Sequence, residues 1–361
     1  MQGILDISLK DVKNNWNILN LASNGKAAAV VKANAYGLGM IEITRALINA
    51  GCRYFYVANI NEGIQLRKNI ENKNITISIF EGLIENKEHE YFNYKLTPII
   101  NNLEQLERLT VFSNQGKKIK SILNIDTGMN RLGLNNKETD FLIKNKEIVY
   151  NLEWEFIMSH LANAETPSSK VNNEQLNKLL NFSKNFPNIK LTLSNSGGIG
   201  LGSKFILDQT RPGIGLYGIN NFGKNIKLNS KNLRFPLKLY APIIQIKEVG
   251  IGEAVSYGGI DLTKRKSTLA TLGVGYADGW IRLLKTNNCI NIQKKKCNIM
   301  GNITMDSFVL DVTDINNKSF KEGDYMCLLD ESNISKLLKD INLISYELLS
   351  LMGNRLIRKY K

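Results

Sequence analysis

The sequence is poor in cysteine, and its cysteines are not paired in motifs. Its 361 residues contain four, Cys52, Cys289, Cys297 and Cys327, and none forms a C-x-x-C pair. A disulfide framework is therefore not expected, and the pattern indicates reduced thiols in the cytoplasm. No zinc-finger spacing of cysteine and histidine occurs either, so we expect no metal site.

Long apolar runs are also missing. No stretch approaches the ~18 apolar residues of a membrane-spanning helix. The N-terminal stretch "MQGILDISLKDVKNN" carries charges too early for a signal peptide. Internal repeats, low-complexity tails and proline-rich linkers are absent as well. At roughly 150 residues per domain, the length predicts two domains, or one large barrel with an appendage.

Acidic residues are fewer than basic ones, 33 against 47, which gives a formal net charge of +14. Such a charge fits either a nucleic-acid-binding surface or lysine spread over solvated faces. The sequence contains no helix-turn-helix signature and no RNP-like motif, which favours the second explanation. We expect neither a nucleic-acid nor a membrane partner. Salt-dependent retention on DNA would support the alternative.

Short apolar runs alternate with helix-like stretches through the first two thirds of the chain. Several runs are almost continuously apolar, as in parallel strands covered on both faces. Eight alternations over about 220 residues predict a (β/α)8 barrel. The expected strands are 27–33, 53–58, 75–80, 97–101, 120–125, 152–158, 190–194 and 214–217.

From about residue 235 the pattern changes to frequent strand-like segments separated by turn residues. Examples are "LKLYAPIIQIKEV" and "DYMCLL", and a final helix is expected in "LISYELLSLMG". This predicts a mostly antiparallel β domain. We therefore expect a barrel over residues 1–232 and a β-rich domain over 233–361.

The stretch "AAAVVKANAYGLG" (27–39) places Lys32 at the end of the first expected strand. A lone lysine there usually sends its ammonium group to water. The alternative is a lysine with a lowered pKa that forms a Schiff base. Active sites of such barrels gather at the carboxyl ends of the strands, where Lys32 and His160 both fall.

Two glycine-rich turns also fall at expected strand ends. They are "SNSGGIG" (194–200) and "RPGIG" (211–215). Their backbone N–H groups are able to hold a phosphate, although each turn alone is a weak signal. A Schiff-base lysine together with phosphate loops on a barrel points to pyridoxal phosphate (PLP).

With these features the chain resembles the alanine racemase family, whose members depend on PLP and have fold type III. "VVKANAYGLG" is similar to that family's PLP-lysine motif. Further matches occur in order along the chain and extend into the second domain. They are "FYVANINEGIQLR", "NIDTGMNRLG", "MSHLANAE", "SNSGG", "RPGIGLYG", "VSYGG", "VGYADGW", "GNITMDSFVLDV" and "ISYELLS".

The resemblance implies two acid/base groups. Lys32 would hold PLP as a Schiff base and act on one face of the substrate's α-carbon. Tyr257 would act on the opposite face, from a second subunit. Racemisation needs both, because a proton leaves one face and another arrives at the other. His160 resembles the histidine that hydrogen-bonds this tyrosine, and cationic neighbours are expected to lower the tyrosine's pKa.

The resemblance also assigns the remaining contacts. Arg211 would face the PLP ring nitrogen and leave it largely unprotonated, which suppresses transamination-type side reactions. The other expected cofactor-binding residues are Tyr36, Asn195, Ser196, Gly213 and Ile214. The expected substrate-binding residues are Arg131, Met305, Tyr276 and Asp306, with the last two lining the entry channel.

Two positions depart from the family pattern. Asn124 stands where several members carry a carbamylated lysine that steadies the arginine. Arg131 would then be held by the neutral amide or by a bound anion such as chloride. Asn354 falls near the place of a tyrosine found beside the cofactor in some relatives. A smaller residue there predicts some tolerance of serine as substrate.

The function that the resemblance implies is interconversion of L- and D-alanine by a homodimer with shared active sites, supplying D-alanine for peptidoglycan. The alternatives within the class are a racemase of broader specificity and a fold-related decarboxylase. A decarboxylase usually places an acidic residue where Arg211 stands. A PLP carrier protein is a further alternative, but it would be a lone barrel without Tyr257 and Met305.

Overall fold

The computed structural model describes residues 1–70, 74–219, 233–287, 289–292, 295–315, 320–334, 336–337 and 345–361. These residues form two compact units. We call them the barrel unit (Lys10–Ala35 and Met40–Arg234) and the β unit (Met1–Leu9, Tyr36–Gly39 and Phe235–Lys361).

This division differs from the expected single boundary between residues 232 and 233. Residues 1–9 belong to the β unit, where strand β1 (Ile4–Ile7) pairs antiparallel with β9 (Leu237–Val249) and parallel with β17 (Ile357–Tyr360). Leu5 and Ile7 are fully buried on alternate positions of β1. Period-2 burial of this kind fits a sheet with one covered face, so these residues form part of a mainly antiparallel sheet.

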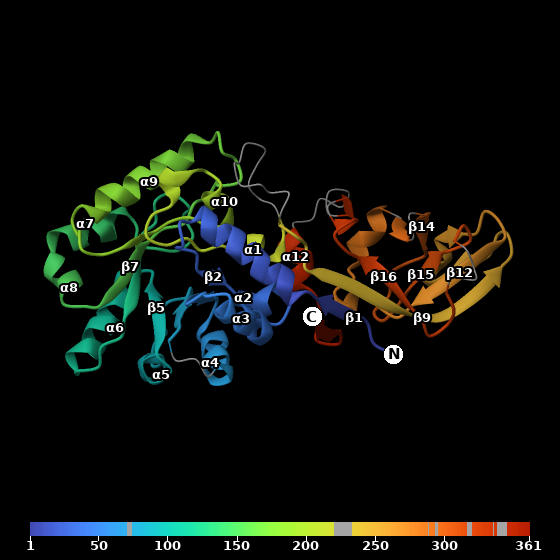
Figure 1. Ribbon diagram of the computed structural model, residues 1–361, viewed down its shortest axis with the longest axis horizontal. Coiled ribbons are helices and arrows are strands. Elements are labelled where there is room, and N and C mark those ends of the chain that lie inside the picture. Colours follow the sequence, from blue (N-terminus) through green and yellow to red (C-terminus); the bar gives the residue numbers. More distant parts are fainter. Residues whose placement is uncertain are drawn as a thin grey trace. The chain divides into compact units, whose positions relative to one another are not determined.

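The barrel unit is built on a parallel sheet with strand order β2-β3-β4-β5-β6-β7-β8 (Figure 1). The central strands are almost continuously buried, as their apolar runs predicted. The expected α/β barrel fold is confirmed, with an incompletely closed eighth position. The seven strands are β2 (Ala29–Val30), β3 (Tyr54–Val57), β4 (Thr76–Ile79), β5 (Leu96–Ile100), β6 (Ser121–Asn124), β7 (Trp154–Met158) and β8 (Leu191–Thr192).

The eighth position is taken by residues 209–211 and not by the expected strand 214–217. Thr192 bridges Gln209, Ala27 bridges Thr210, and the Arg211 N–H donates to Ser194 O at 2.8 Å. Residues Ile214–Tyr217 form the 3-10 helix η2 instead. An apolar run this short is compatible with a strand or a helix, and the glycines around it favour a turn.

Helices surround these strands in the barrel unit (Figure 1). Several begin at an asparagine whose side chain accepts a backbone N–H, as Asn59, Asn102 and Asn135 do. The helices are α1 (Leu9–Ala22), α2 (Lys32–Tyr36), α3 (Met40–Asn49), α4 (Ile60–Asn69), α5 (Glu88–Asn93), α6 (Leu103–Asn114), α7 (Asn136–Lys144), α8 (Lys146–Tyr150), α9 (Lys170–Ser183), α10 (Ser196–Ile199) and the 3-10 turn η1 (Ser203–Phe205).

The β unit is mostly antiparallel, as expected, with strand order β13-β14-β15-β12-β9-β1-β17 and β16 also paired to β9. The 13-residue strand β9 organises it, since one end pairs with β1 and β16 and the other with β12. The remaining strands are β10 (Ala254–Val255), β11 (Asp261–Leu262), β12 (Ser267–Leu272), β13 (Cys289–Ile292), β14 (Lys295–Met300), β15 (Phe308–Asp311) and β16 (Tyr325–Leu329).

Short helical turns connect the strands of the β unit. The helix expected in 343–353 appears as α12 (Ser345–Ser350), and residues 343–344 lie outside the described residues. The 3-10 turns are η4 (Tyr257–Gly259), η5 (Tyr276–Asp278) and η6 (Arg282–Asn287). Among the helices of the described ranges, none has the length and apolar character needed to cross a membrane.

The loop after β6 gives a first test. Gly133 has φ +111°, and a Cβ there would lie 2.8 Å from the Asp126 amide nitrogen. We expect Gly133→Ala to lower the free energy of unfolding by about 2–3 kcal/mol, because the backbone of Ile125 and Asp126 would have to move. Urea denaturation measures it. Gly116→Ala is the control, since Gly116 has φ +78° with no atom within 4 Å of its Cβ position. If both variants lost the same unfolding free energy, the close approach of the backbone to Gly133 would be contradicted.

Candidate active site

Lys32 opens an unusual turn at the carboxyl end of β2. Ala33, Asn34 and Ala35 all have left-handed backbone angles, with φ of 52°, 54° and 53°. Each such residue costs roughly 1–2 kcal/mol relative to the right-handed form. Runs of this kind persist only where surrounding contacts impose them, and they cluster at functional sites.

The Lys32 amine lies in a half-buried, electropositive place. Its Nζ is 5.5 Å from the centre of the Phe80 ring. Burial lowers the pKa of Lys32, the charge of Arg131 lowers it further, and Glu62 acts in the opposite direction. The neutral amine is the nucleophile and the proton acceptor, so this environment suits covalent chemistry at Lys32.

Arg211 lies in the core of the barrel unit, only 2% exposed. Its guanidinium donates to Ser159 O at 2.7 Å, to Leu193 O at 3.2 Å and to the Thr192 hydroxyl. Burial lowers the pKa of Arg211 to about 10, so it stays charged at neutral pH. Within the described residues, its Nε–H is buried without a hydrogen-bond partner. This N–H group can therefore donate a hydrogen bond to an uncharged acceptor atom of a bound ligand.

His160 connects these groups. Burial and the charges of Arg211, Arg131 and Lys32 lower the pKa of His160 to about 3. Arg211 Nη2 lies 3.4 Å from His160 Nδ1, and an arginine only donates. His160 is therefore neutral at pH 7, with Nδ1 accepting and the proton on Nε2, which leaves an N–H to donate.

The two glycine-rich turns meet at Ser196. The Ser196 Oγ accepts the N–H of Gly213 at 3.0 Å and that of Gly215 at 3.1 Å. Because both lone pairs accept, this hydroxyl can bind an anion only by donating its own proton. Asn195 accepts the Gly198 N–H at 2.9 Å and caps α10. Ile214 begins η2 and is buried beside them.

The loop "DTGMNRLG" folds back onto β6 and presents Arg131. The Asp126 carboxylate accepts the N–H groups of Gly128 and Met129, and the Leu134 N–H donates to Asn124 O at 2.8 Å. The Asn124 side chain donates to Asn101 Oδ1 at 2.8 Å. Arg131 is exposed, and its charge acts on Lys32 and His160.

Tyr257 lies in the β unit with its side chain 77% exposed. Its loop is nevertheless fixed. Asn302 Nδ2 donates to Tyr257 O at 3.2 Å, and the Gly301 N–H donates to Asp261 at 2.7 Å. Asp261 also pairs with Lys285 at 2.8 Å. A rigid loop thus presents an exposed phenol.

Tyr276, Met305 and Asp306 come together in the β unit. The N–H of Tyr276 donates to Thr304 O at 3.0 Å and that of Ala277 to Met305 O at 3.1 Å. Met305 is 52% exposed. Arg355 bridges Asp306 at 2.7 Å and Asp278 at 3.0 Å, which holds this cluster to the C-terminal segment.

Tyr36 and Asn354 also belong to the β unit. Burial, followed by the neighbouring Tyr346, raises the pKa of Tyr36 to about 12, so its phenol is a neutral hydroxyl. Asn354 is exposed and directly precedes Arg355. The expected site residues therefore divide between the units, with Lys32, Arg131, His160, Asn195, Ser196, Arg211, Gly213 and Ile214 in the barrel unit.

The motifs gave no indication of two residues, Gln175 and Arg355, that hold expected site residues in place. Gln175 on α9 donates to His160 O at 2.9 Å and to Thr127 Oγ1 at 3.3 Å, and accepts the Ala162 N–H at 2.8 Å. Arg355 has a comparable role in the β unit. Gln175 is almost fully buried, and a glutamine in a helical pattern gives no sign in sequence of which loops it will reach.

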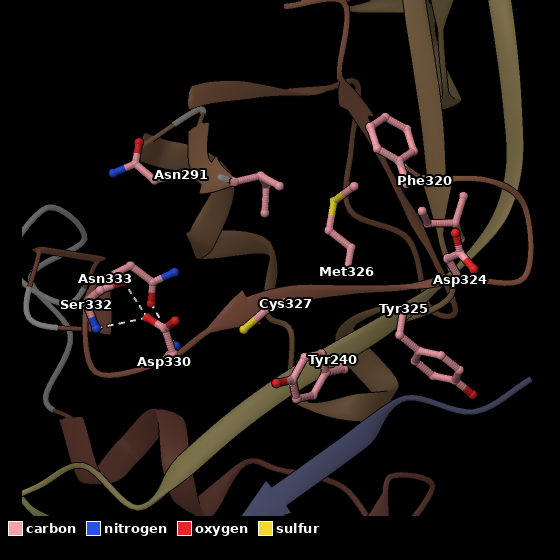
Figure 2. Close-up of a pocket in the computed structure, with 12 residues that line it drawn as sticks. Tyr240, Asn291, Phe320, Asp324, Tyr325, Met326, Cys327, Asp330, Ser332 and Asn333 are labelled. Atoms are coloured by element: carbon pink, nitrogen blue, oxygen red, sulfur yellow. Dashed lines mark hydrogen bonds between the residues drawn. The ribbon is translucent and has the colours of Figure 1, made fainter. Parts of the chain in front are cut away.

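A separate pocket of about 870 Å³ lies in the β unit between β9, β13 and β16 (Figure 2). None of the expected site residues lines it. Two of its polar side chains are engaged locally: Asp330 accepts the Ser332 N–H at 2.8 Å, and Asn333 donates to Leu328 O at 2.9 Å. Figure 2 shows Asp330 hydrogen-bonded to Ser332 and to Asn333, contacts that stabilise a turn.

Two family models match consecutive parts of the chain. "Alanine racemase, N-terminal domain" matches residues 7–221, and "Alanine racemase, C-terminal domain" matches residues 236–360. The chain belongs to the alanine racemase family. The resemblance found in the ordered motifs is thereby confirmed.

Individual alanine racemases agree with this over almost the whole length. The chain is 40% identical over 341 residues to the alanine racemase of Rickettsia bellii, covering 94% of this chain and 82% of that protein. Identity to the Rickettsia rickettsii alanine racemase is 37% over 359 residues, covering 99% and 98%. The crystal structure of the Bartonella henselae alanine racemase with covalently bound pyridoxal phosphate superposes with a TM-score of 0.93 at 36% identity, covering both chains fully.

The lowered pKa of His160 predicts a pH-dependent stability. It is about 3 in the folded protein against an ordinary value of 6.5. Between these values the unfolded chain binds more protons, so the free energy of unfolding falls as pH falls. His160→Asn keeps an acceptor for Arg211 and removes the titrating group. We expect a smaller loss of stability from pH 7 to pH 5 than in the parent, measured by urea denaturation without ligand. An unchanged loss would contradict the assignment.

Proposed function

We propose that this member of the alanine racemase family interconverts L- and D-alanine, with PLP bound covalently to Lys32. The observation that carries the proposal is the buried Arg211 Nε–H without a partner, in a cluster with His160 and the electropositive Lys32. The Bartonella henselae relative, with covalently bound pyridoxal phosphate, supports the cofactor.

The residues of the barrel unit fit PLP. An Nε–H donor from a charged arginine suits an unprotonated ring nitrogen, because an arginine cannot accept a proton from it. The Ser196 hydroxyl, with Gly213 and Ile214 beside it, would meet the phosphate, and Asn195 would complete that contact. Bound PLP supplies an aldehyde that joins the Lys32 amine with loss of water, and a ring that withdraws electrons from the α-carbon.

The protonation states suit proton exchange on two faces. Lys32 has a lowered pKa, so its amine is able to take the α-proton when the substrate holds the cofactor. Tyr257 would serve the other face. The neutral His160 has its Nε2–H free of Arg211 and would donate to the tyrosine oxygen. Arg131 would neutralise the substrate carboxylate, with the Met305 N–H, and Tyr276 and Asp306 would line the entry.

A homodimer would complete each site. Tyr257 and Met305 are exposed on the β unit, although each is proposed to meet substrate. Catalytic side chains work in places from which water is excluded, so a covering surface is required. A second copy of the chain, placed so that its barrel unit receives these side chains, would provide it.

The proposed product is D-alanine for peptidoglycan, made in the cytoplasm. The described cysteines, Cys52, Cys289, Cys297 and Cys327, are all free thiols, which agrees with a reducing compartment. Burial raises the pKa of Cys52 to about 12, so this thiol is unreactive.

Chiral separation after incubation with single L-amino acids tests the reaction. We expect rapid D-alanine formation by the PLP-loaded protein and a smaller yield of D-serine, because Asn354 is small and exposed. Lys32→Ala should reduce turnover by at least about 10³-fold, since it removes both the covalent link and one acid/base group. Release of CO2 without inversion would instead identify a decarboxylase. Inversion of larger amino acids only would show that the protein is a racemase whose substrate is not alanine.

Mixing two inactive variants tests the shared site. Lys32→Ala and Tyr257→Phe should each be nearly inactive alone. If each site combines Lys32 of one chain with Tyr257 of another, random mixed dimers contain one intact site. Unfolding and refolding an equal mixture should then restore about a quarter of parental activity. No restoration, with mixed dimers present by native mass spectrometry, would show that both groups act within one chain.

A further inference from the structure

The Glu62 side chain joins two backbone amides at the ends of neighbouring barrel strands. Its Oε1 accepts the Ala33 N–H at 2.7 Å, and its Oε2 accepts the Ala58 N–H at 2.7 Å. Ala33 directly follows Lys32 after β2, and Ala58 directly follows β3. Both carboxylate oxygens are thus used, one on each strand end.

Glu62 is itself held in place. It lies in the first turn of α4, and its N–H donates to the Asn59 side chain at 3.0 Å. A carboxylate in the first turn of a helix is favoured by the helix dipole. The bridge is therefore anchored on a helix of the barrel and not on a mobile loop.

The contact to Ala33 controls the direction of Lys32. The Ala33 N–H belongs to the planar peptide group that also contains the Lys32 carbonyl. Fixing that plane fixes the backbone rotation between Lys32 and the left-handed turn, and with it the direction of the Lys32 side chain. Two further contacts hold this turn: Asn34 accepts the Met40 N–H at 2.9 Å, and the Ala35 N–H donates to Val31 O at 2.9 Å.

We propose that Glu62 is a positioning residue that imposes the left-handed turn after Lys32 and so aims the Lys32 amine at the reacting carbonyl of its cofactor. This rests on the proposed attachment of PLP to Lys32. Accepting both backbone N–H groups requires a carboxylate. An amide has only one acceptor oxygen, and its NH2 group would face the second N–H without forming a hydrogen bond. The negative charge has a second effect, since Glu62 raises the pKa of Lys32 against burial and Arg131.

Glu81 supplies a matched control. Its Oε1 accepts the Ile60 N–H at 2.9 Å, at the start of the same helix. It thus binds a backbone amide as Glu62 does, but no contact joins it to the turn after Lys32 in the described structure. Glu62→Gln is compared with Glu81→Gln. Glu62→Asp keeps the charge and shortens the reach by one methylene group, which separates charge from geometry.

The first measurement uses the protein without cofactor. Lys32 is labelled with an amine-reactive reagent at a series of pH values, and its peptide is quantified by mass spectrometry against an exposed lysine. We expect the labelling midpoint of Lys32 to move to lower pH in Glu62→Gln, because an anion that raises the pKa is lost. Glu81→Gln should keep the parental midpoint. An unchanged midpoint in Glu62→Gln would overturn the placement of the Glu62 charge beside the Lys32 amine on which the proposal rests.

The second measurement is covalent attachment of PLP, followed by its visible absorbance and by mass after borohydride reduction. We expect attachment at least about tenfold slower in Glu62→Gln and in Glu62→Asp than in the parent, because a misdirected amine reacts slowly. Equal slowing in Glu81→Gln would overturn the proposal and leave Glu62 as a helix cap. Unfolding midpoints check the fold, and if Glu62→Gln does not fold, Glu62→Asp decides the outcome.

The two proposals fail in different ways. If the parent itself attaches no PLP, the proposed function fails, whatever the variants do. If the parent attaches PLP at Lys32 and the Glu62 variants attach it equally fast, only the positioning role fails.

Discussion

Positive charge concentrated at one end of the barrel is the constraint on which the site depends. Burial has the largest effect in lowering the pKa of His160, and the charges of Arg211, Arg131 and Lys32 lower it further. Like charges in a buried region of low dielectric constant repel one another strongly unless a bound anion neutralises them. Glu62 opposes them at Lys32, but both of its oxygens already hold backbone amides. The cluster therefore lowers the pKa values of Lys32 and His160 and also favours ligands that bring a phosphate and a carboxylate.

The segment that follows the turn after Lys32 is fixed within the β unit. The chain leaves the barrel unit after Ala35 and re-enters it at Met40, and the segment between belongs to the β unit. There Arg358 donates to Gly37 O at 2.9 Å and Tyr360 donates to Leu38 O at 3.0 Å. A Cβ on Gly37 would lie 2.2 Å from Leu349 O, so only glycine permits this approach. The left-handed turn that begins at Lys32 thus leads directly into a segment that is held within the β unit.

Prediction from sequence worked best where the local pattern and the tertiary structure agree. Strands β4 to β7 are short apolar runs bounded by polar turns, and burial on both faces requires that pattern. It failed at the eighth position, where the polar residues Gln209 and Thr210 form isolated bridges to Thr192 and Ala27 without fully closing the barrel. Gln209 and Thr210 are buried and hydrogen-bonded, to Tyr56 and to Ser23, and such pairing leaves no periodic signal. Residues 1–9 were misplaced for a related reason, since an alternating strand does not indicate which sheet it joins.

The sequence by itself determined the chemical groups and their order. Lys32, His160, Arg211 and Tyr257 stand in motifs that match the family pattern, and the family was expected from ten such motifs in order along the chain. Only the tertiary structure decided how those groups are tuned. The tautomer of His160, the unpartnered Nε–H of Arg211 and the bridge of Glu62 each depend on contacts between segments distant in sequence. The direction and protonation state of a side chain depend on its neighbours in space. A sequence pattern specifies such neighbours only within one helix or strand.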